Sequence, residues 1–295
     1  MSATVPDKAI LVVNAMSRRG DEAFERACEL IEGAGIELIE RHAVETPEDL
    51  RPTIEKAIET APMVIVGGGD GTISSFAGSF KDKDTVLAPL PLGTANSFAR
   101  TLGHPIELEE AVQSLANGRV ERIDLGCIDN NWFANVAALG LSPLIAETIP
   151  DKLKKYLSFV GYVLWAAYMA FRFHPFRLTV EVDGKRETHW STEVRIANGR
   201  FHGGVELVED ADISDGRITV QAITGKSLWH LAWSWFTTVF HLAARERTWR
   251  EWEAPSLKLE THPPKKISVD GEIRASTPCE VKVVADAIRV VMPSS

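Results

Sequence analysis

A glycine-rich loop directly after a short apolar run constrains the fold of this chain more than any other feature of its sequence. Met63–Val66 has the sequence MVIV, which predicts a buried strand, and the loop Gly67–Thr72 (GGGDGT) follows at once. Four glycines in five positions are more than a tight turn needs. Ligands bind at the carboxyl ends of strands in an open parallel sheet, where glycines let backbone N–H groups approach a phosphate closely. The loop therefore predicts a phosphate site, with a plain strand-to-helix turn as the simpler alternative.

Two known phosphate-binding loops do not match this segment. A Walker loop ends in Gly-Lys-Ser/Thr, and no lysine follows the glycines here. A dinucleotide fingerprint needs a third glycine where this chain has Thr72. Asp70 is still suited to orienting a metal or a sugar hydroxyl, and Thr72 to donating a hydrogen bond to a phosphate oxygen.

A second loop of the same character follows the next apolar run. Leu87–Leu92 is apolar, and Gly93-Thr94-Ala95-Asn96 comes directly after it, before a segment typical of a helix. Loops that follow neighbouring strands lie at the same edge of a parallel sheet. We therefore expect the two loops to hold one nucleotide between them.

The first part of the chain alternates apolar strands with amphipathic helices. This alternation predicts a doubly wound, Rossmann-like α/β nucleotide-binding domain over residues 1–125. The expected strands and helices, besides those that flank the two loops, are Ala9–Asn14, Asp21–Ala34, Ile36–His42, Pro47–Thr60 and Ile73–Phe80.

After Asp124 the pattern changes to short strands separated by turn signals. Residues 126–276 therefore predict an antiparallel, β-sandwich-like domain, interrupted by a helix over Leu153–Phe173. The last strands, in 277–295, are expected to pack back on the first domain. The expected strands are Trp132–Val136, Arg177–Val182, Trp190–Ala197, Arg217–Ile223, Leu257–Thr261, Lys266–Val269, Cys279–Val284 and Ala287–Met292.

Composition narrows the classes of function. The net charge of −9 argues against broad nucleic-acid binding, which needs a positive surface. The three cysteines are far apart and show neither disulfide nor metal-ligand spacing, so a reducing, cytoplasmic setting is expected. Leu157–Phe171 is uncharged but shorter than the roughly 20 residues that cross a bilayer. The oligomeric state stays open, a homodimer included.

The two loops together carry a family resemblance. GGGDGT at Gly67–Thr72 with PLGTANSFAR at Pro91–Arg100 resembles the catalytic domain of diacylglycerol kinases, and more narrowly the soluble bacterial lipid kinases of that family. GGDGT alone is shared with NAD kinases, so the second loop and later segments carry the distinction. The further matching segments, in order along nearly the whole chain, are the opening strand with Asn14, Asp124–Gly126, Phe133–Gly140, Asn198–Arg200, Asp212–Ile218 and Asp270–Glu272.

The resemblance implies a phosphotransferase that uses ATP with Mg²⁺ to phosphorylate a hydroxyl of a membrane lipid such as a diacylglycerol. Such a substrate implies peripheral contact with the inner face of the membrane. A tryptophan-rich helix expected over Ser227–Ala244 suits either that contact or a protein core. The residues that the resemblance assigns to nucleotide binding are Asn14, Gly68, Gly69, Asp70, Gly71, Thr72, Ile73, Ser74, Ser75, Gly93, Thr94 and Asn96.

Asp270-Gly271-Glu272 is the candidate catalytic segment. By pattern alone it is a hairpin turn, and Val182-Asp183-Gly184 repeats the tripeptide Val-Asp-Gly where only a turn is expected. The family has its base in such a segment. The resemblance therefore implies Glu272 as acceptor of the hydroxyl proton, Asp270 as the second choice and Asp70 as a catalytic carboxylate beside the phosphates.

The acidic segment Glu209–Arg217 predicts only a solvated turn by itself. Its carboxylate and carbonyl oxygens are, however, the ligands that Mg²⁺ prefers. Relatives have a Mg²⁺ site in the matching segment, which implies Asp215 as a ligand here with contributions from Asp212 and Arg217. This site is separate from the metal that accompanies ATP.

Two departures from the family pattern leave other functions open. Ser97 stands where the family usually has Asp, and Ser74-Ser75 stands where it often has Asn-Glu. One alternative is an NAD kinase-like phosphotransferase with a soluble substrate. The other is a lipid- or nucleotide-binding protein without turnover.

Overall fold

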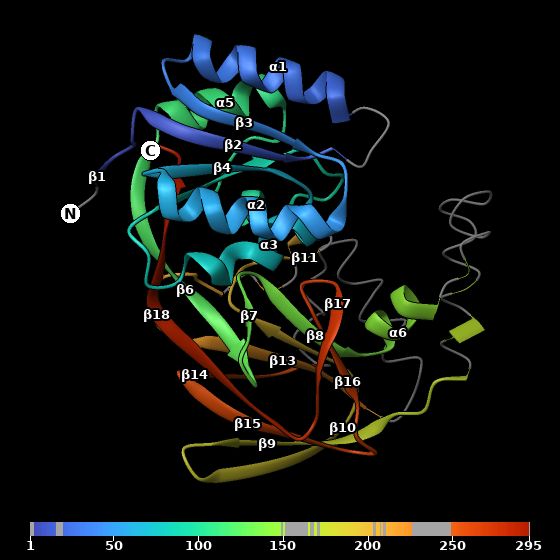
Figure 1. Cartoon of the computed structure of the whole chain (residues 1–295). Coiled ribbons are helices and arrows are strands. Elements are labelled where there is room, and N and C mark those ends of the chain that lie inside the picture. Colours follow the sequence, from blue (N-terminus) through green and yellow to red (C-terminus); the bar gives the residue numbers. More distant parts are fainter. Residues whose placement is uncertain are drawn as a thin grey trace.

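The computed structural model describes residues 3–15, 20–148, 150, 165, 168–169, 172–202, 205–206, 208, 211–225 and 249–294. Within them, an α/β region with parallel strands is followed by an antiparallel, β-rich region, which confirms the predicted fold class (Figure 1). The helices expected over Leu153–Phe173 and Ser227–Ala244 lie mostly or wholly outside the described residues.

The N-terminal region is a three-layered arrangement of helix, sheet and helix (Figure 1). Its main elements are β2 (Lys8–Asn14), α1 (Gly20–Gly33), β3 (Glu37–Val44), α2 (Pro47–Thr60), β4 (Met63–Gly68), α3 (Asp70–Ala77), β5 (Val86–Pro91) and α5 (Leu108–Ala116). The parallel strands run in the order β3-β2-β4-β5. Ile10 and Val12 pack with α2 and α3, whereas Leu11 packs with α1 and α5 on the other face. Burial on both faces explains why β2 is a continuous apolar run.

The β-rich region is antiparallel. Its main elements are β6 (Arg119–Ile128), β7 (Asn131–Phe133), β8 (Val136–Gly140), α6 (Leu141–Thr148), β9 (Phe176–Val182), β10 (Lys185–Ala197), β13 (Ile218–Thr224), β14 (Trp249–Ala254), β15 (Ser256–His262), β16 (Lys266–Val269), β17 (Glu272–Ser276) and β18 (Cys279–Met292). In β15, Leu257, Leu259 and Thr261 are buried and the residues between them are exposed. This period of two is expected where one face of a strand meets the core and the other meets water. The shorter elements of the chain are β1 (Ala3–Thr4), η1 (Gly78–Phe80), α4 (Ser97–Thr101), β11 (Phe201–His202) and β12 (Val205–Glu206).

The last strand, β18, joins the two regions into one sheet. It pairs in parallel with β5, where Val290 lies opposite Leu87, and antiparallel with β6 and β15. The prediction of two terminal strands was wrong, because they form one strand that bends at a register shift between Val284 and Ile288. The opposite correction applies to Trp132–Val136, which is two strands because β7 pairs with β6 and β8 pairs with β10 and β16.

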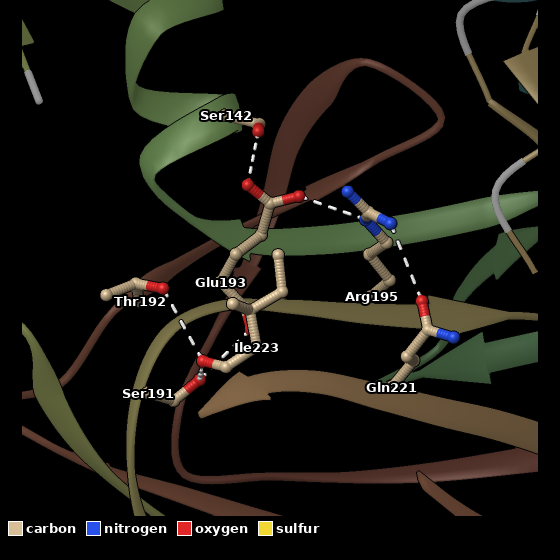
Figure 2. A network of polar contacts seen from close by, with 7 residues as sticks. All are labelled: Ser142, Ser191, Thr192, Glu193, Arg195, Gln221 and Ile223. Carbon is tan, nitrogen blue, oxygen red and sulfur yellow. Dashed lines mark hydrogen bonds and ion pairs between the residues drawn. The ribbon is translucent and has the colours of Figure 1, made fainter. Parts of the chain in front are cut away.

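A buried polar network on β10 fixes the start of α6. Glu193 and Arg195 form an ion pair with an Oε1–Nε distance of 3.0 Å, and their side chains are 2% and 5% exposed. The hydroxyl of Ser142, in the first turn of α6, donates to the other carboxylate oxygen, and Arg195 donates to Gln221 at 3.5 Å (Figure 2). Removing one partner of a buried ion pair costs about 3–5 kcal/mol. Through Ser142, this network connects the start of α6 to the sheet.

Candidate active site

The first glycine loop lies at the carboxyl end of β4 and continues directly into α3. The carbonyl of Gly69, the residue before the helix, accepts hydrogen bonds from the N–H groups of Thr72 and Ile73 at 3.0 and 3.1 Å. The helix thus begins at Asp70, before the predicted start at Ile73. The first N–H groups of a helix have no partner within it and carry partial positive charge. This end of α3 is therefore suited to a phosphate group.

The second loop is shaped from within by Asn96. Its backbone is left-handed, with φ of +50°, and its side chain accepts a hydrogen bond from the Gly93 N–H at 2.9 Å and donates to the Gly93 carbonyl at 2.8 Å. Asn96 is only 1% exposed, whereas Thr94 at the tip is exposed. Asn96 therefore stabilises the loop, and Thr94 is the predicted nucleotide contact that the loop presents.

The two glycine loops touch each other. A β-carbon on Gly93 would lie 2.4 Å from the Cα of Gly69, a separation that real side chains do not show. Asp70 adds a second link, because its carboxylate accepts the Phe98 N–H at 3.0 Å. The loops thus meet as expected from neighbouring strands, since β4 and β5 pair along their length. The approach is too close for any residue other than glycine at position 93.

The remaining predicted nucleotide-binding residues divide into accessible and buried ones. Asn14, at the end of β2, donates from Nδ2 to the Thr72 hydroxyl at 2.9 Å, which brings a third strand end to the site. Ile73 and Ser74 are 1% and 2% exposed, so their side chains belong to the interior. Ser75 is half-buried, and its hydroxyl donates to the Gly71 carbonyl at 2.5 Å.

Asp270 occupies the turn between β16 and β17 and faces this loop region. Its carboxylate accepts the N–H groups of Ala134 and Val136, both at 3.2 Å, and its own N–H donates to the Val136 carbonyl. Burial is the main reason why the pKa of Asp270 rises to about 7, and the nearby charge of Asp70 raises it further. The hairpin that carries Asp270 is connected to the helix after the first glycine loop by a hydrogen bond from Arg274 to Ser75 at 3.1 Å.

Glu272 lies on the same hairpin and is connected to α3 through a residue that the motifs did not single out. The side chain of Glu272 is 60% exposed and forms an ion pair with Arg274 at 2.6 Å. Arg274 also donates to the Ser75 hydroxyl at 3.1 Å. Arg274 therefore ties the candidate base to the helix that follows the first glycine loop.

The acidic segment does not gather its carboxylates around one point. Asp212 accepts hydrogen bonds from the N–H and hydroxyl of Ser214, and Asp215 accepts the Arg217 N–H at 2.8 Å. Both carboxylates are exposed. The described residues contain no cluster of three or more His, Cys, Asp or Glu side chains that could hold a metal ion.

Asp124 connects this segment to the rest of the fold and was missed as a site residue. It is 2% exposed, and its two carboxylate oxygens accept the N–H groups of Gly216 at 2.8 Å and Asp286 at 2.9 Å. Burial raises the pKa of Asp124. Asn198 donates to the Asp124 and Ala134 carbonyls at 3.0 and 2.9 Å. The short segments of the resemblance therefore meet at the junction of the two regions.

Comparison with known proteins identifies the family. Residues 8–128 match the model of the diacylglycerol kinase catalytic domain, and residues 136–292 match that of the YegS C-terminal NAD kinase beta sandwich-like domain. A relative from Enterobacter sp. (strain 638), named probable lipid kinase YegS-like, is 32% identical over 235 residues that cover 77% of each chain. A relative of the same name from Yersinia pestis (strain Pestoides F) is 32% identical over 229 residues, 74% of this chain and 76% of its own.

A solved structure supports the fold. The structure of a proposed diacylglycerol kinase from Bacillus anthracis str. Sterne superposes with a TM-score of 0.81 over 97% of this chain and 95% of its own, at 22% identity. No helix among the described residues is long and apolar enough to cross a membrane. The family models cover most of the chain, and kinases of this family use ATP. The chain therefore belongs to the YegS-like lipid kinases with a diacylglycerol kinase catalytic domain, and it is a phosphotransferase.

Proposed function

We propose that this kinase transfers the γ-phosphate of ATP to a hydroxyl of a membrane lipid of the diacylglycerol type. The observation that carries the proposal is the contact between Gly69 and Gly93, which joins two loops into one cradle of backbone N–H groups, with the Asp270–Glu272 hairpin connected to the adjoining helix through Arg274 and Ser75. Phosphoryl transfer depends mainly on positioning and on neutralising charge, and such a cradle is suited to both.

The cradle suits a nucleotide triphosphate because side chains are missing where phosphates would lie. Gly69, Gly71 and Gly93 leave the backbone accessible, whereas Gly68 is buried at the end of β4, and Thr72 and Thr94 add hydroxyl donors. Asn14, Asp70 and Asn96 hold the loops in this arrangement through the hydrogen bonds described above. ATP supplies the phosphoryl group, and the chain supplies its position.

Glu272 is the stronger candidate for the base that accepts the hydroxyl proton. Both carboxylate oxygens of Asp270 already accept backbone N–H groups, so Asp270 holds the hairpin in place. The carboxylate of Glu272 is exposed beside α3, where an incoming hydroxyl can reach it. A general base must lie within hydrogen-bond reach of the proton that it takes.

Mg²⁺ is part of the proposal as the ion that accompanies ATP and as an ion bound near Asp215. The exposed carboxylates of Asp212 and Asp215 and the carbonyl groups beside them, that of Arg217 included, are hard oxygen donors of the kind Mg²⁺ accepts. One carboxylate with neighbouring carbonyl groups is enough, because Mg²⁺ usually keeps several water ligands. Such an ion would stabilise the segment that Asp124 connects to β18.

The proposal is tested with ATP labelled at the γ-phosphate and a fractionated panel of lipids, with NAD as a soluble acceptor. The expected result is label in a lipid fraction for the wild-type protein, and strong loss of label in Glu272→Ala and Asp70→Ala proteins that remain folded. Transfer to NAD alone would favour an NAD kinase-like activity. ATP binding without transfer to any acceptor would favour a binding protein.

A further inference from the structure

Two adjoining grooves lie beside the candidate active site and belong to no part of the mechanism. One has a volume of about 250 Å³ and the other about 230 Å³, and both are lined by Leu144, Phe173 and Lys265. The second is also lined by Ile273, which follows Glu272 in the hairpin. The second groove therefore borders the hairpin that carries the candidate base. The other residues that line them are Gly140, Pro143, Glu147, Met169, Arg172, His174, Pro175, Pro263, Pro264 and Lys266.

The walls of the grooves are held firmly. The Ser142–Glu193 contact fixes the start of α6, which provides Leu144. Farther along α6, Glu147 forms an ion pair with Lys266 at 2.9 Å. The grooves are thus part of the folded surface between α6 and β16, which we call the α6–β16 face and define by the residues that line the two grooves.

The charge of this face is opposite to that of the whole chain. The protein carries a net charge of −9, yet the described residues that line the grooves include Arg172, Lys265 and Lys266 against a single acid, Glu147. A positive face on an acidic protein favours a negatively charged partner.

Lys265 is a basic residue of this face for which the described residues offer no acidic partner. Its ammonium lies 5.2 and 5.4 Å from the ring centres of Phe173 and Phe176 and pairs with no acid among the described residues. Burial lowers the pKa of Lys265. A partly desolvated cation at the junction of two grooves is therefore available to an anionic group from outside the chain.

The apolar groups of the face suit a lipid interface. Ile273 is 39% exposed, and Tyr168, which lies beside the face in contact with Arg172, is 46% exposed. These are two of the four exposed large hydrophobic side chains among the described residues. Arg172 donates to the Tyr168 hydroxyl at 2.6 Å and lies over its ring. Aromatic and basic side chains of this kind gather where a protein meets lipid headgroups.

We propose that the α6–β16 face docks on an anionic bilayer, with Arg172, Lys265 and Lys266 at the phosphate headgroups and Ile273 and Tyr168 in the interfacial layer. The reason for docking rests on the proposed function, because docking on this face brings the Glu272 hairpin to the acceptor lipid. The occupant is a bilayer because the face combines an excess of positive charge with exposed apolar and aromatic groups.

The test is co-sedimentation of the full chain with vesicles, without ATP. Vesicles of phosphatidylcholine are compared with vesicles that also contain phosphatidylglycerol. The variant is Arg172→Glu with Lys266→Glu. The control is Arg51→Glu with Lys258→Glu, which changes the net charge by the same amount outside the α6–β16 face, at residues with similar exposure and contacts. Lys258 and Lys266 have side chains 65% and 66% exposed, each paired with one glutamate, and Arg51, like Arg172, lies over an aromatic ring.

The expected result is wild-type binding that needs phosphatidylglycerol, unchanged in the control and weakened about 30-fold or more in the variant. That figure follows from about 1 kcal/mol for each basic residue near an anionic surface, applied to two residues. Equal binding by variant and control, or equal wild-type binding to both vesicles, would overturn the proposal. The proposal would also be overturned if light scattering showed that the variant changes from a dimer to a monomer while its vesicle binding stayed the same.

A separate assay distinguishes failure of docking from failure of the proposed function. Phosphoryl transfer to a short-chain, water-soluble diacylglycerol does not need a bilayer, so the variant should keep it while losing activity on vesicles. If no lipid accepts phosphate but vesicle binding still separates variant from control, the docking surface stands and the proposed function does not.

Discussion

Two hairpins in this protein contain the tripeptide Val-Asp-Gly in the same type of turn. One joins β9 to β10 through Asp183 and Gly184, with φ angles of +50° and +76°. The other joins β16 to β17 through Asp270 and Gly271, with φ angles of +46° and +97°. Two left-handed residues produce the twist that matches neighbouring strands. The local sequence therefore determines the turn in the same way at both places.

The surroundings of the two turns differ. The β9–β10 hairpin lies at the end of the β-rich region farthest from β4 and β5 (Figure 1), Asp183 in its turn is exposed, and Lys185 follows the turn. Asp270 is half-buried and accepts two backbone N–H groups, its pKa is raised mainly by burial, and Glu272 follows its turn. A sequence motif becomes a candidate active site only through what the tertiary fold brings to it.

The largest contrast is expected at the residue after each turn. Glu272→Gln should lower phosphoryl transfer by about 10²–10⁴-fold, the range for loss of a general base. Lys185→Gln at the matching position should leave activity unchanged. Radiolabel transfer to the best lipid acceptor measures both. If Glu272→Gln is as active as Lys185→Gln, Glu272 is not the base, and the two hairpins do not differ in function.

The next contrast is the dependence of stability on pH. The pKa of Asp270 is about 7 in the folded protein and about 3.9 when unfolded. The folded state therefore binds more protons between these values, and stability falls as pH rises through that window. Asn has no charge to bury, so Asp270→Asn should gain stability relative to wild type as pH rises from about 4 to about 8.

Thermal unfolding midpoints at both ends of this pH range measure that effect. Asp183→Asn serves as the control because its side chain is exposed, and its midpoints should follow those of the wild type. If Asp270→Asn differs from wild type by the same amount at both pH values, burial of the Asp270 charge is not what distinguishes the two turns.

The smallest contrast concerns the arginine beside each hairpin. Arg274 pairs with Glu272 and donates to Ser75 on α3, whereas Arg186 pairs with Glu260 on the neighbouring strand. Exposed ion pairs contribute roughly 0–1 kcal/mol, so neither Arg274→Ala nor Arg186→Ala should lower the free energy of unfolding by more than that.

Only Arg274→Ala should reduce kcat/KM, by roughly tenfold, since about 1.4 kcal/mol of lost positioning corresponds to that factor. Equal kinetics in the two variants would contradict a positioning role for Arg274.

The N-terminal region was largely predictable because its signals are local. Thr46 and Pro47 mark the start of α2, and the predicted helix Pro47–Thr60 has the observed bounds. The apolar runs of β4 and β5 predict buried parallel strands. The glycines that follow each run predict the two loops, which meet at Gly69 and Gly93. Each of these features depends on a few consecutive residues.

The contacts that the sequence did not reveal join residues that are far apart in the chain. Arg274 and Ser75 are 199 positions apart, and Asp124 and Asp286 are 162 apart. No period or short motif connects such pairs, because β18 brings them together by pairing with β5 and β6. The roles of Asp70, Asp270, Glu272 and the acidic segment near Asp215 stay predictions for the experiments above.

The central claim is that the contact between the two glycine loops forms the nucleotide site. Isothermal titration of ATP with Mg²⁺ into Gly93→Ala and Gly33→Ala proteins tests it most directly, because a β-carbon at Gly33 meets nothing within 4 Å while one at Gly93 meets the Gly69 backbone. We predict that Gly33→Ala binds as the wild type does and that Gly93→Ala, with an unchanged circular dichroism spectrum, binds at least about tenfold more weakly, a loss of roughly 1.4 kcal/mol. Unchanged ATP binding by Gly93→Ala would contradict the claim.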